Sequence, residues 1–257
     1  MTTQKSLYPG SLFHFTDKGG LFSILESTFK VSYAREKISG YNQQRDFAVP
    51  MVSFCDLRIS ELNVHMSKYG KYGIGLTKEW ANRKGLNPVM YVNKHCPFTN
   101  DFIKAIDGIY RHLNLIEDEN EFQKLNIDYM NVLNVYRYLK NYEGELIRSD
   151  AEIDPNYRFA DEREWRFVPP LGSSGFFPFL PISRVRTKRL KAEENNRISN
   201  IRLEFEPDDI KYLIIKSESE IPLLIEHLRI VKDKFDQQTI DKLLCRILTY
   251  DQIYSDI

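Results

Sequence analysis

Two short stretches of the chain hold the residues best suited to chemistry. The first, SLFHFT (residues 11–16), alternates aromatic and polar residues, which predicts a strand. His14 and Thr16 lie two residues apart, so both side chains would point to one face of that strand. An imidazole and a hydroxyl there can hydrogen-bond a sugar or a carboxamide. The alternative is a half-exposed strand whose histidine makes only local hydrogen bonds.

The second stretch, DEREWRFVPP (161–170), brings a carboxylate and a guanidinium to one face of a short predicted strand. Glu164 and Arg166 alternate there with Arg163 and Trp165. A glutamate at the lip of a sheet can hold a ribose hydroxyl and stabilise oxocarbenium-like charge, and an adjacent arginine makes an ion pair or a substrate clamp. The alternative, which the spacing alone favours, is an edge strand with solvated charges and Trp165 as its core anchor.

A third stretch, SKYGKYGIGL (67–76), combines tyrosines with glycines. Tyr69 or Tyr72 could stack on a flat heterocycle, since glycines allow a ligand to approach the backbone closely. Equally, the glycines could form a turn into a strand whose tyrosines cover the core. The sequence leaves both interpretations open.

Metal chemistry and the common nucleotide-binding folds lack support in the sequence. Asp56, Glu61 and His65 lie within ten residues, but no helical histidine pair or cysteine pair accompanies them, so no metal is expected. The P-loop, G-x-G-x-x-G, G-x-S-x-G and H-E-x-x-H patterns are absent. Their absence argues against common nucleotide hydrolases, Rossmann dehydrogenases and serine hydrolases.

Composition limits the classes of partner. The 257 residues carry 36 basic and 36 acidic side chains, so net charge does not indicate a nucleic-acid substrate, although a local basic groove remains possible. No apolar run approaches the roughly 18 residues of a membrane helix, and no membrane partner is expected. Three widely spaced cysteines form no disulfide or zinc pattern, which favours a reducing cytoplasm.

The order of predicted elements favours a single α+β domain over residues 1–257, with a mixed, mostly antiparallel sheet. A helical insertion is predicted at about 100–145, where helical periodicity runs almost without breakers, and a helical segment at about 218–257. Asp17 and Thr77 are the predicted N-caps of helices that follow strands. These elements would bring the stretches around His14 and Glu164 to one sheet.

Five blocks of the sequence carry a family resemblance. They are LFHFT…GLFSILES, VPMVSFCDLRIS, KYGKYGIGLTKEWANRKGLNPVMYV, EREWRFVP and DIKYLIIKSESEIPLLI. In this order they resemble the AbiGi family of abortive phage-infection proteins, the antitoxin component of a bacterial toxin–antitoxin pair. The resemblance spans most of the chain and implies an anti-phage function with a cognate toxin or antitoxin protein as partner.

More distantly, the opening block followed much later by the E-x-E-W-R stretch is similar to a widespread bacterial domain of unknown function, and the opening half of this pattern also resembles DarT-type DNA ADP-ribosyltransferases. That likeness implies an ADP-ribosyltransferase-like fold, NAD as cofactor and Glu164 as the catalytic carboxylate. The cofactor-binding side chains would be those of His14, Thr16, Arg35, Tyr69, Tyr72 and Arg166. In this scheme the histidine meets the ribose or carboxamide, one tyrosine stacks, and one arginine meets the pyrophosphate. Glu162 and Glu164 have a Glu-x-Glu spacing, but the surrounding pattern differs from such enzymes and no S-T-S strand is present.

Two functions follow, and they make different structural predictions. An NAD-dependent ADP-ribosyltransferase-like protein requires His14, Glu164 and Arg166 to converge in one cleft with a tyrosine nearby. A non-catalytic antitoxin requires no convergence and would use an exposed apolar patch or a helical tail as its interface. The stretch IPLLIEHLRIVKDKF (221–235) could be such a tail, although packing against the sheet is the favoured interpretation.

Overall fold

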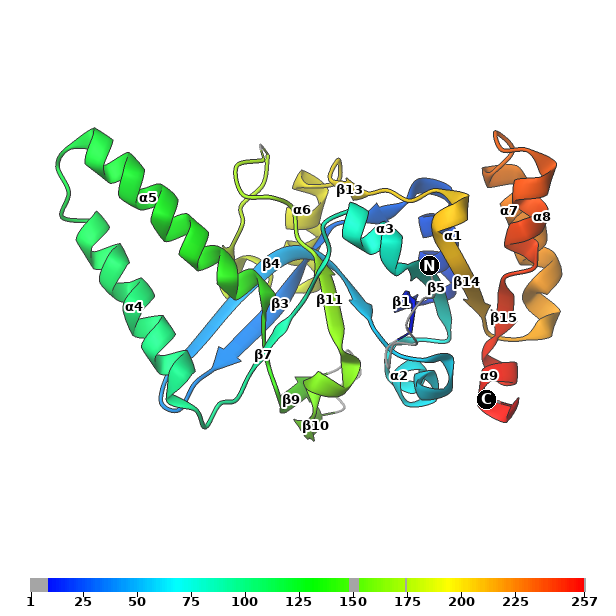
Figure 1. The fold of residues 1–257 in the computed structure, drawn as a ribbon, viewed down its shortest axis with the longest axis horizontal. Coiled ribbons are helices and arrows are strands. Elements are labelled where there is room, and N and C mark those ends of the chain that lie inside the picture. The colour runs from blue at the N-terminus through cyan, green and yellow to red at the C-terminus, as the bar shows by residue number, and fades with distance from the viewer. Residues whose placement is uncertain (1–8, 148–152, 174, 257) are drawn as a thin grey trace, which may run out of the picture.

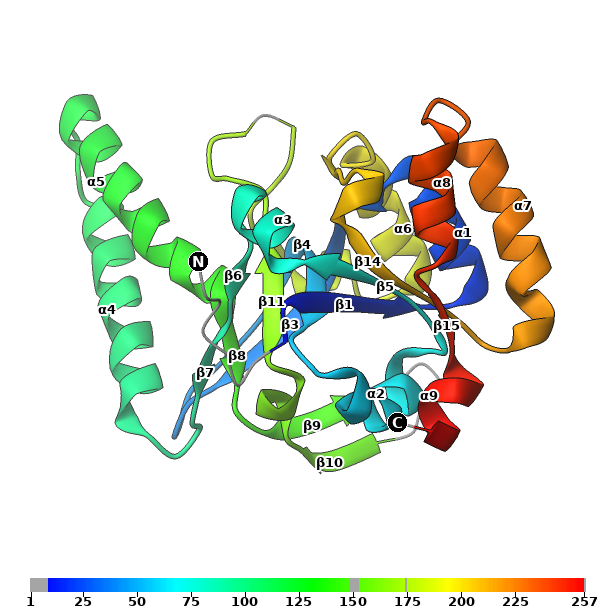
Figure 2. The ribbon, with the colours of Figure 1, turned by 45° about the vertical axis from the view of Figure 1, so that its right-hand side comes forward.

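A computed structural model of the chain describes residues 9–147, 153–173 and 175–256, and its main feature is one mixed sheet (Figures 1 and 2). The central strands are β1 (Ser11–Thr16), β4 (Gln44–Cys55), β5 (Tyr72–Thr77) and β11 (Glu164–Phe167). The outer strands are β6 (Asn87–Pro88), β14 (Ile210–Ile215) and β15 (Ile247–Thr249). The order is β15-β14-β5-β1-β4-β11-β6, and every neighbouring pair is antiparallel except β14 and β15. This confirms the predicted α+β class with a mixed, mostly antiparallel sheet.

The long strand β4 connects the two halves of the sheet. Its first half pairs with β3 (Ser32–Ser39) and β12 (Leu180–Pro181), and its second half pairs with β1 and β11. Cys55, the last residue of β4, is opposite Phe13 on one side and Glu164 on the other. This register decides which of the candidate residues share a face.

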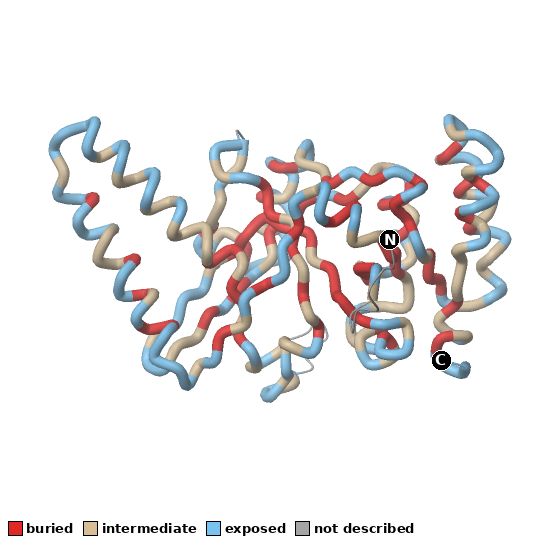
Figure 3. Tube along the Cα trace, in the orientation of Figure 1, coloured by how far each residue is buried: buried red, intermediate tan, exposed pale blue. Residues whose placement is uncertain are grey.

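Helices cover both faces of the sheet. On one face, α1 (Lys18–Ser27), α3 (Lys78–Arg83) and α7 (Ile221–Val231) pack on a core that includes Phe54 and Trp80. On the other, α2 (Leu62–Tyr69) and α9 (Tyr250–Asp256) pack on Phe13, Phe15 and Cys55. Figure 3 shows the buried residues gathered in the strands between these layers.

The predicted N-caps of α1 and α3 are confirmed. The carboxylate of Asp17 accepts a hydrogen bond from the Gly20 amide at 2.7 Å, and the Thr77 hydroxyl accepts one from the Trp80 amide at 3.2 Å. Each cap satisfies an amide that the first turn of a helix leaves unpaired. As a result, β1 leads into α1 and β5 leads into α3 without a long connecting loop.

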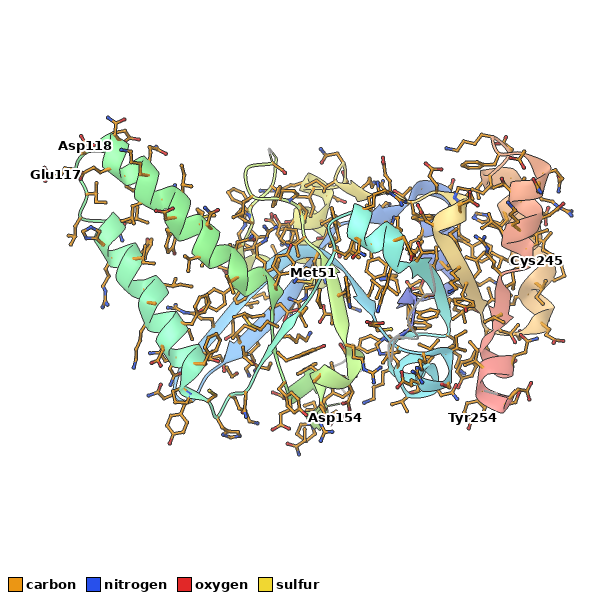
Figure 4. All side chains as sticks on the ribbon, viewed as in Figure 1. Met51, Glu117, Asp118, Asp154, Cys245 and Tyr254 are labelled. Atoms are coloured by element: carbon orange, nitrogen blue, oxygen red, sulfur yellow. The ribbon has the colours of Figure 1, made fainter. Side chains whose placement is uncertain are left out.

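A helical hairpin extends from one end of the sheet (Figure 1). It is formed by α4 (Pro97–Leu113) and α5 (Glu119–Leu133), both within or beside the predicted insertion at 100–145. Figure 4 shows Glu117 and Asp118 at its far tip. The chain then returns through η2 (Asn134–Tyr138) to β8 (Leu139–Asn141), which pairs with β7 (Met90–Val92), and to β9 (Gly144–Ile147), which pairs with β10 (Ile153–Tyr157).

The sequence predicts a helical segment at about 218–257, but the structure there is not entirely helical. It contains α7, α8 (Gln237–Leu244) and α9, but the strand β15 separates the last two and extends the sheet beside β14. Three residues are too few to show a strand period, and the pairing partner lies far away in sequence. In α7, Leu224 and Leu228 are fully buried, which agrees with the favoured packing interpretation of 221–235.

The remaining elements are short. Strands β2 (Phe29–Lys30) and β13 (Arg202–Leu203) pair with each other, and α6 (Lys188–Arg197) packs beside β3. In the described parts of the chain, no helix is both long and apolar enough to cross a membrane.

Candidate functional site

The predicted catalytic strand β11 lies inside the sheet, between β4 and β6. Its two charged side chains are buried: Glu164 is 5% exposed and Arg166 is fully enclosed. The interpretation that spacing alone favoured, an edge strand with solvated charges, is therefore wrong. Alternation along the strand does place Glu164 and Arg166 on one face, as predicted.

Arg166 is at the centre of a buried ion-pair network. Its Nε donates to Glu164 Oε1 at 2.6 Å, and its Nη2 donates to Glu36 Oε1 at 2.8 Å. Its Nη1 donates to the carbonyl oxygens of Arg137 and Leu139 at 3.0 and 3.3 Å. Burial alone would lower the pKa of Arg166, but the two carboxylates outweigh it and hold that pKa above its usual value.

Glu164 has partners on every side. It accepts a hydrogen bond from the Ser53 hydroxyl at 2.8 Å, and Lys140 Nζ lies 3.4 Å from its Oε2. Its backbone amide donates to the Tyr91 hydroxyl at 2.8 Å. Burial opposes ionisation, but Arg166 and Lys140 outweigh it and lower the pKa of Glu164 to about 2. Its carboxylate is thus ionised, enclosed and already bound by the protein's own cations.

His14 does not face this network. Phe13 and Glu164 are both opposite Cys55, so their side chains share a face, and His14, the next residue, points to the other face. There its ring packs against Phe29 and Phe54, and its Nδ1 donates to the Ser53 carbonyl at 2.8 Å. The predicted pairing of His14 with Glu164 across a cleft is therefore wrong.

Thr16 and Tyr72 lie on the same face as His14, because they are opposite each other in β1 and β5. The Tyr72 hydroxyl donates to Glu220 at 2.9 Å, and Lys18 pairs with the same carboxylate at 3.1 Å. Burial and the bond to Glu220 raise the pKa of Tyr72 to about 12. This polar group belongs to the contact between β5, α1 and the start of α7, away from Glu164.

Arg35 lies on β3, next to Glu36, and points away from it. Its Nε donates to the Val185 carbonyl at 3.0 Å, and its Nη2 donates to the same oxygen. The structure thus brings Glu164 and Arg166 together and leaves Arg35, His14, Thr16 and Tyr72 elsewhere. Their assignment as cofactor-binding residues stays a prediction.

The Tyr69 hydroxyl donates a hydrogen bond to Glu162, a carboxylate to which the sequence analysis assigned no role. Glu162, at the end of the 3-10 turn η3 (Phe159–Glu162), is 7% exposed. Its Oε1 accepts hydrogen bonds from the hydroxyls of Tyr69 and, at 2.8 Å, of Tyr157. Burial raises the pKa of Glu162, although Lys140 and the two hydroxyls oppose that rise. The only sequence signal for it is the Glu162–Glu164 spacing.

Glu162 lines a hollow of about 330 Å³ between η3 and α2, hereafter the Glu162 hollow. Its polar lining is formed by Glu61, His65, Tyr157, Asp161, Glu162 and Arg163. Arg163 has a φ of +46°, a left-handed conformation in which it ends η3 just before β11 begins. Arg163 Nη1 pairs with Glu61 Oε2 across the hollow at 3.2 Å.

Comparisons with known proteins agree with one another. Residues 27–216 match the model of a family described as "Putative abortive phage resistance protein AbiGi, antitoxin". The chain belongs to the AbiGi family. It is also 26% identical, over 243 residues, to the abortive phage resistance protein AbiGi of Lactococcus lactis subsp. cremoris, a match covering 86% of this chain and 94% of that relative. No solved structure matches the chain.

Proposed function

We propose that this AbiGi chain is a non-catalytic, cytoplasmic antitoxin that neutralises a toxin protein by binding it. The observation that carries the proposal is the state of Glu164, whose carboxylate is enclosed by Arg166, Lys140 and Ser53. A carboxylate that is to stabilise developing positive charge must face the substrate, and this one faces the protein's own cations. The family description, which names an antitoxin, supports the same function.

The position of His14 supports the proposal from the other face of the sheet. A transferase of the predicted kind needs the first-strand histidine and the late glutamate to contact one ligand. Here the backbone of β4 lies between them, because Ser53 accepts from His14 through its carbonyl and donates to Glu164 through its hydroxyl. Together these contacts favour a structural role for both residues.

The test combines capture of binding proteins with a growth assay. The tagged chain is purified from its own bacterium, and each captured protein is expressed alone and together with the chain. We expect one captured protein that arrests growth alone and is relieved by the chain. If no captured protein behaves in this way, the proposal fails.

Binding and turnover of NAD stay a prediction with a separate test. Calorimetry with NAD and a nicotinamide-release assay are applied to the wild type and to Glu164→Gln. A non-catalytic antitoxin gives no release from either protein. Release by the wild type that Glu164→Gln abolishes, with the variant shown to be folded, would overturn the proposal and establish the transferase-like function.

A further inference from the structure

One oxygen of Glu162 has no donor in the described structure. Both hydrogen bonds to this carboxylate, from Tyr69 and Tyr157, end on Oε1, and no described residue donates to Oε2. Only 7% of the residue is exposed, but Oε2 is not among the buried side-chain atoms that lack a hydrogen-bond partner, so this oxygen keeps contact with solvent. Two hydroxyls hydrogen-bond this carboxylate, but it has no salt bridge among the described residues, so its negative charge is only partly compensated.

The cations around Glu162 already pair with other carboxylates. Lys140 lies between Glu36 and Glu164, at 3.6 and 3.4 Å. Lys68 pairs with Asp154 at 3.5 Å, and Asp154 is labelled near the lower edge of the molecule in Figure 4. The third neighbour, Arg163, pairs with Glu61. Among the described residues, no cation lies within salt-bridge distance of Glu162 or of Asp161, the exposed acid beside it.

The lining of the Glu162 hollow suits an organic cation. Leu57, Val64 and Ala160 provide an apolar wall, and the ring of Tyr157 provides a flat surface, whereas the His65 ring is already stacked on Tyr69 with ring centres 4.4 Å apart. Lys68 Nζ lies 4.0 Å from the centre of the Tyr157 ring, so that ring already holds a positive charge on one side. No described group of three His, Cys, Asp or Glu side chains is arranged to hold a metal ion.

Size and charge weigh against an anionic ligand. A volume of about 330 Å³ is at the lower end of the range of about 300–1,000 Å³ for ligand sites, and it suits one side chain better than a dinucleotide. A pyrophosphate would also meet the carboxylates of Asp161 and Glu162.

We infer that the Glu162 hollow receives an arginine or lysine side chain of the protein that this antitoxin neutralises. This rests on the proposed function. An entering guanidinium donates to the Glu162 carboxylate, places its plane against an aromatic ring and covers the apolar wall with its methylene stem. Such a charge-assisted contact in a half-open hollow has the properties of an interface hot spot, because the entering side chain itself excludes water from it.

The first experiment tests the hollow alone. N-acetyl-L-arginine amide is titrated into the protein and followed by NMR at His65 and Tyr157. N-acetyl-L-citrulline amide, which has nearly the same shape but no charge, is the matched ligand. We expect saturable shifts with the arginine compound only, and at least a fivefold loss of affinity in Glu162→Gln.

Two further variants keep this result interpretable. Glu162→Asp keeps the negative charge but shortens the side chain, so we expect it to bind the arginine compound more weakly than the wild type and more tightly than Glu162→Gln, which makes the charge testable even if Glu162→Gln folds poorly. Glu193→Gln, on exposed α6, changes the net charge equally and should bind as the wild type. Equal shifts with both ligands, or unchanged affinity in a folded Glu162→Gln, would overturn the inference.

The second experiment uses the toxin identified by the growth assay. We expect Glu162→Gln to bind it at least tenfold more weakly than the wild type, and Glu193→Gln to bind it equally. If the arginine compound binds but the toxin binds Glu162→Gln and wild type with equal affinity, the hollow is a cation site but does not receive a side chain of the toxin, and that part of the inference is wrong. If the growth assay yields no toxin while the arginine compound still binds, the proposed function fails but the cation site stands.

Discussion

Glu162 and Glu164 are two residues apart, but their surroundings shift the pKa values of the two carboxyl groups in opposite directions. Arg166 and Lys140 overcome the effect of burial at Glu164 and lower its pKa to about 2. Burial dominates at Glu162 and raises its pKa, because Lys140, the cation that opposes this rise, is shared with two other carboxylates. Glu164 therefore stabilises the fold as a permanent anion, whereas the carboxylate of Glu162 is available to a positive charge of a partner protein.

We expect Glu164→Gln to lower the free energy of unfolding at pH 7 by about 3 kcal/mol, because it leaves Arg166 and Lys140 with one buried carboxylate, Glu36. The folded pKa of Glu164 is depressed from its ordinary 4.5 to about 2. Its contribution is therefore present above pH 4.5 and is lost as the pH falls toward 2.

Urea unfolding of both proteins at pH 7, 5 and 3 measures this effect, and the gap between them should narrow as the pH falls. Glu193→Gln is the control, since it breaks only an exposed pair with Arg189 and should cost less than about 0.5 kcal/mol. A constant gap at all three pH values would contradict the ionised state assigned to Glu164.

The sequence predicted part of this site, for a local reason. Alternation along one strand correctly placed His14 with Thr16, and Glu164 with Arg166, because the period of a strand is local. Whether the two pairs share a face depends on the register of β1 and β11 on β4, which joins Phe13, Cys55 and Glu164 across about 150 residues. No local sequence pattern encodes that register. Nor does a local pattern predict that Glu36 pairs with Arg166 or that Lys140 pairs with Glu164.

At the scale of elements, the glycines of β5 have a packing role. An added Cβ at Gly75 would lie 2.8 Å from the Phe13 ring and 3.1 Å from the Tyr212 ring. Phe13 and Tyr212 stack on each other with ring centres 5.6 Å apart, directly over this position. Of the two interpretations left open for residues 67–76, the glycines thus fit the one in which the strand makes room for the core.

Gly75→Ala should therefore destabilise the protein by about 1–3 kcal/mol, because the rings of Phe13 and Tyr212 must shift in a filled core. Gly108→Ala in α4 is the matched control. A Cβ at Gly108 meets nothing within 4 Å, so this change should stabilise the helix by about 0.5–1 kcal/mol. Thermal unfolding of both variants measures the difference, and equal shifts would show that the space above β5 is not filled.

At the scale of the whole molecule, burial is unevenly distributed. The strands and the helices on them supply most of the enclosed side chains, whereas α5 contains no buried residue (Figure 3). The hairpin is attached mainly through α4, where Ile103 and Ile106 are buried, and through the contacts of Arg166 with the chain that follows α5. Helical periodicity predicted these helices, but not that they would extend away from the sheet, because that depends on what their apolar faces meet.

This distribution predicts three levels of protection from hydrogen exchange. Amides of β1 and β5 should exchange most slowly, since both strands are enclosed and pair with each other along their whole length. Amides of α4 should be intermediate, and those of α5 should exchange fastest, because opening α5 exposes only partly buried side chains such as Val132 and Leu133, whereas opening α4 exposes buried ones. Mass spectrometry of peptides from these segments at pH 7 measures the order. If α5 were as protected as β5, the hairpin would unfold only with the sheet, and the two would form one cooperative unit.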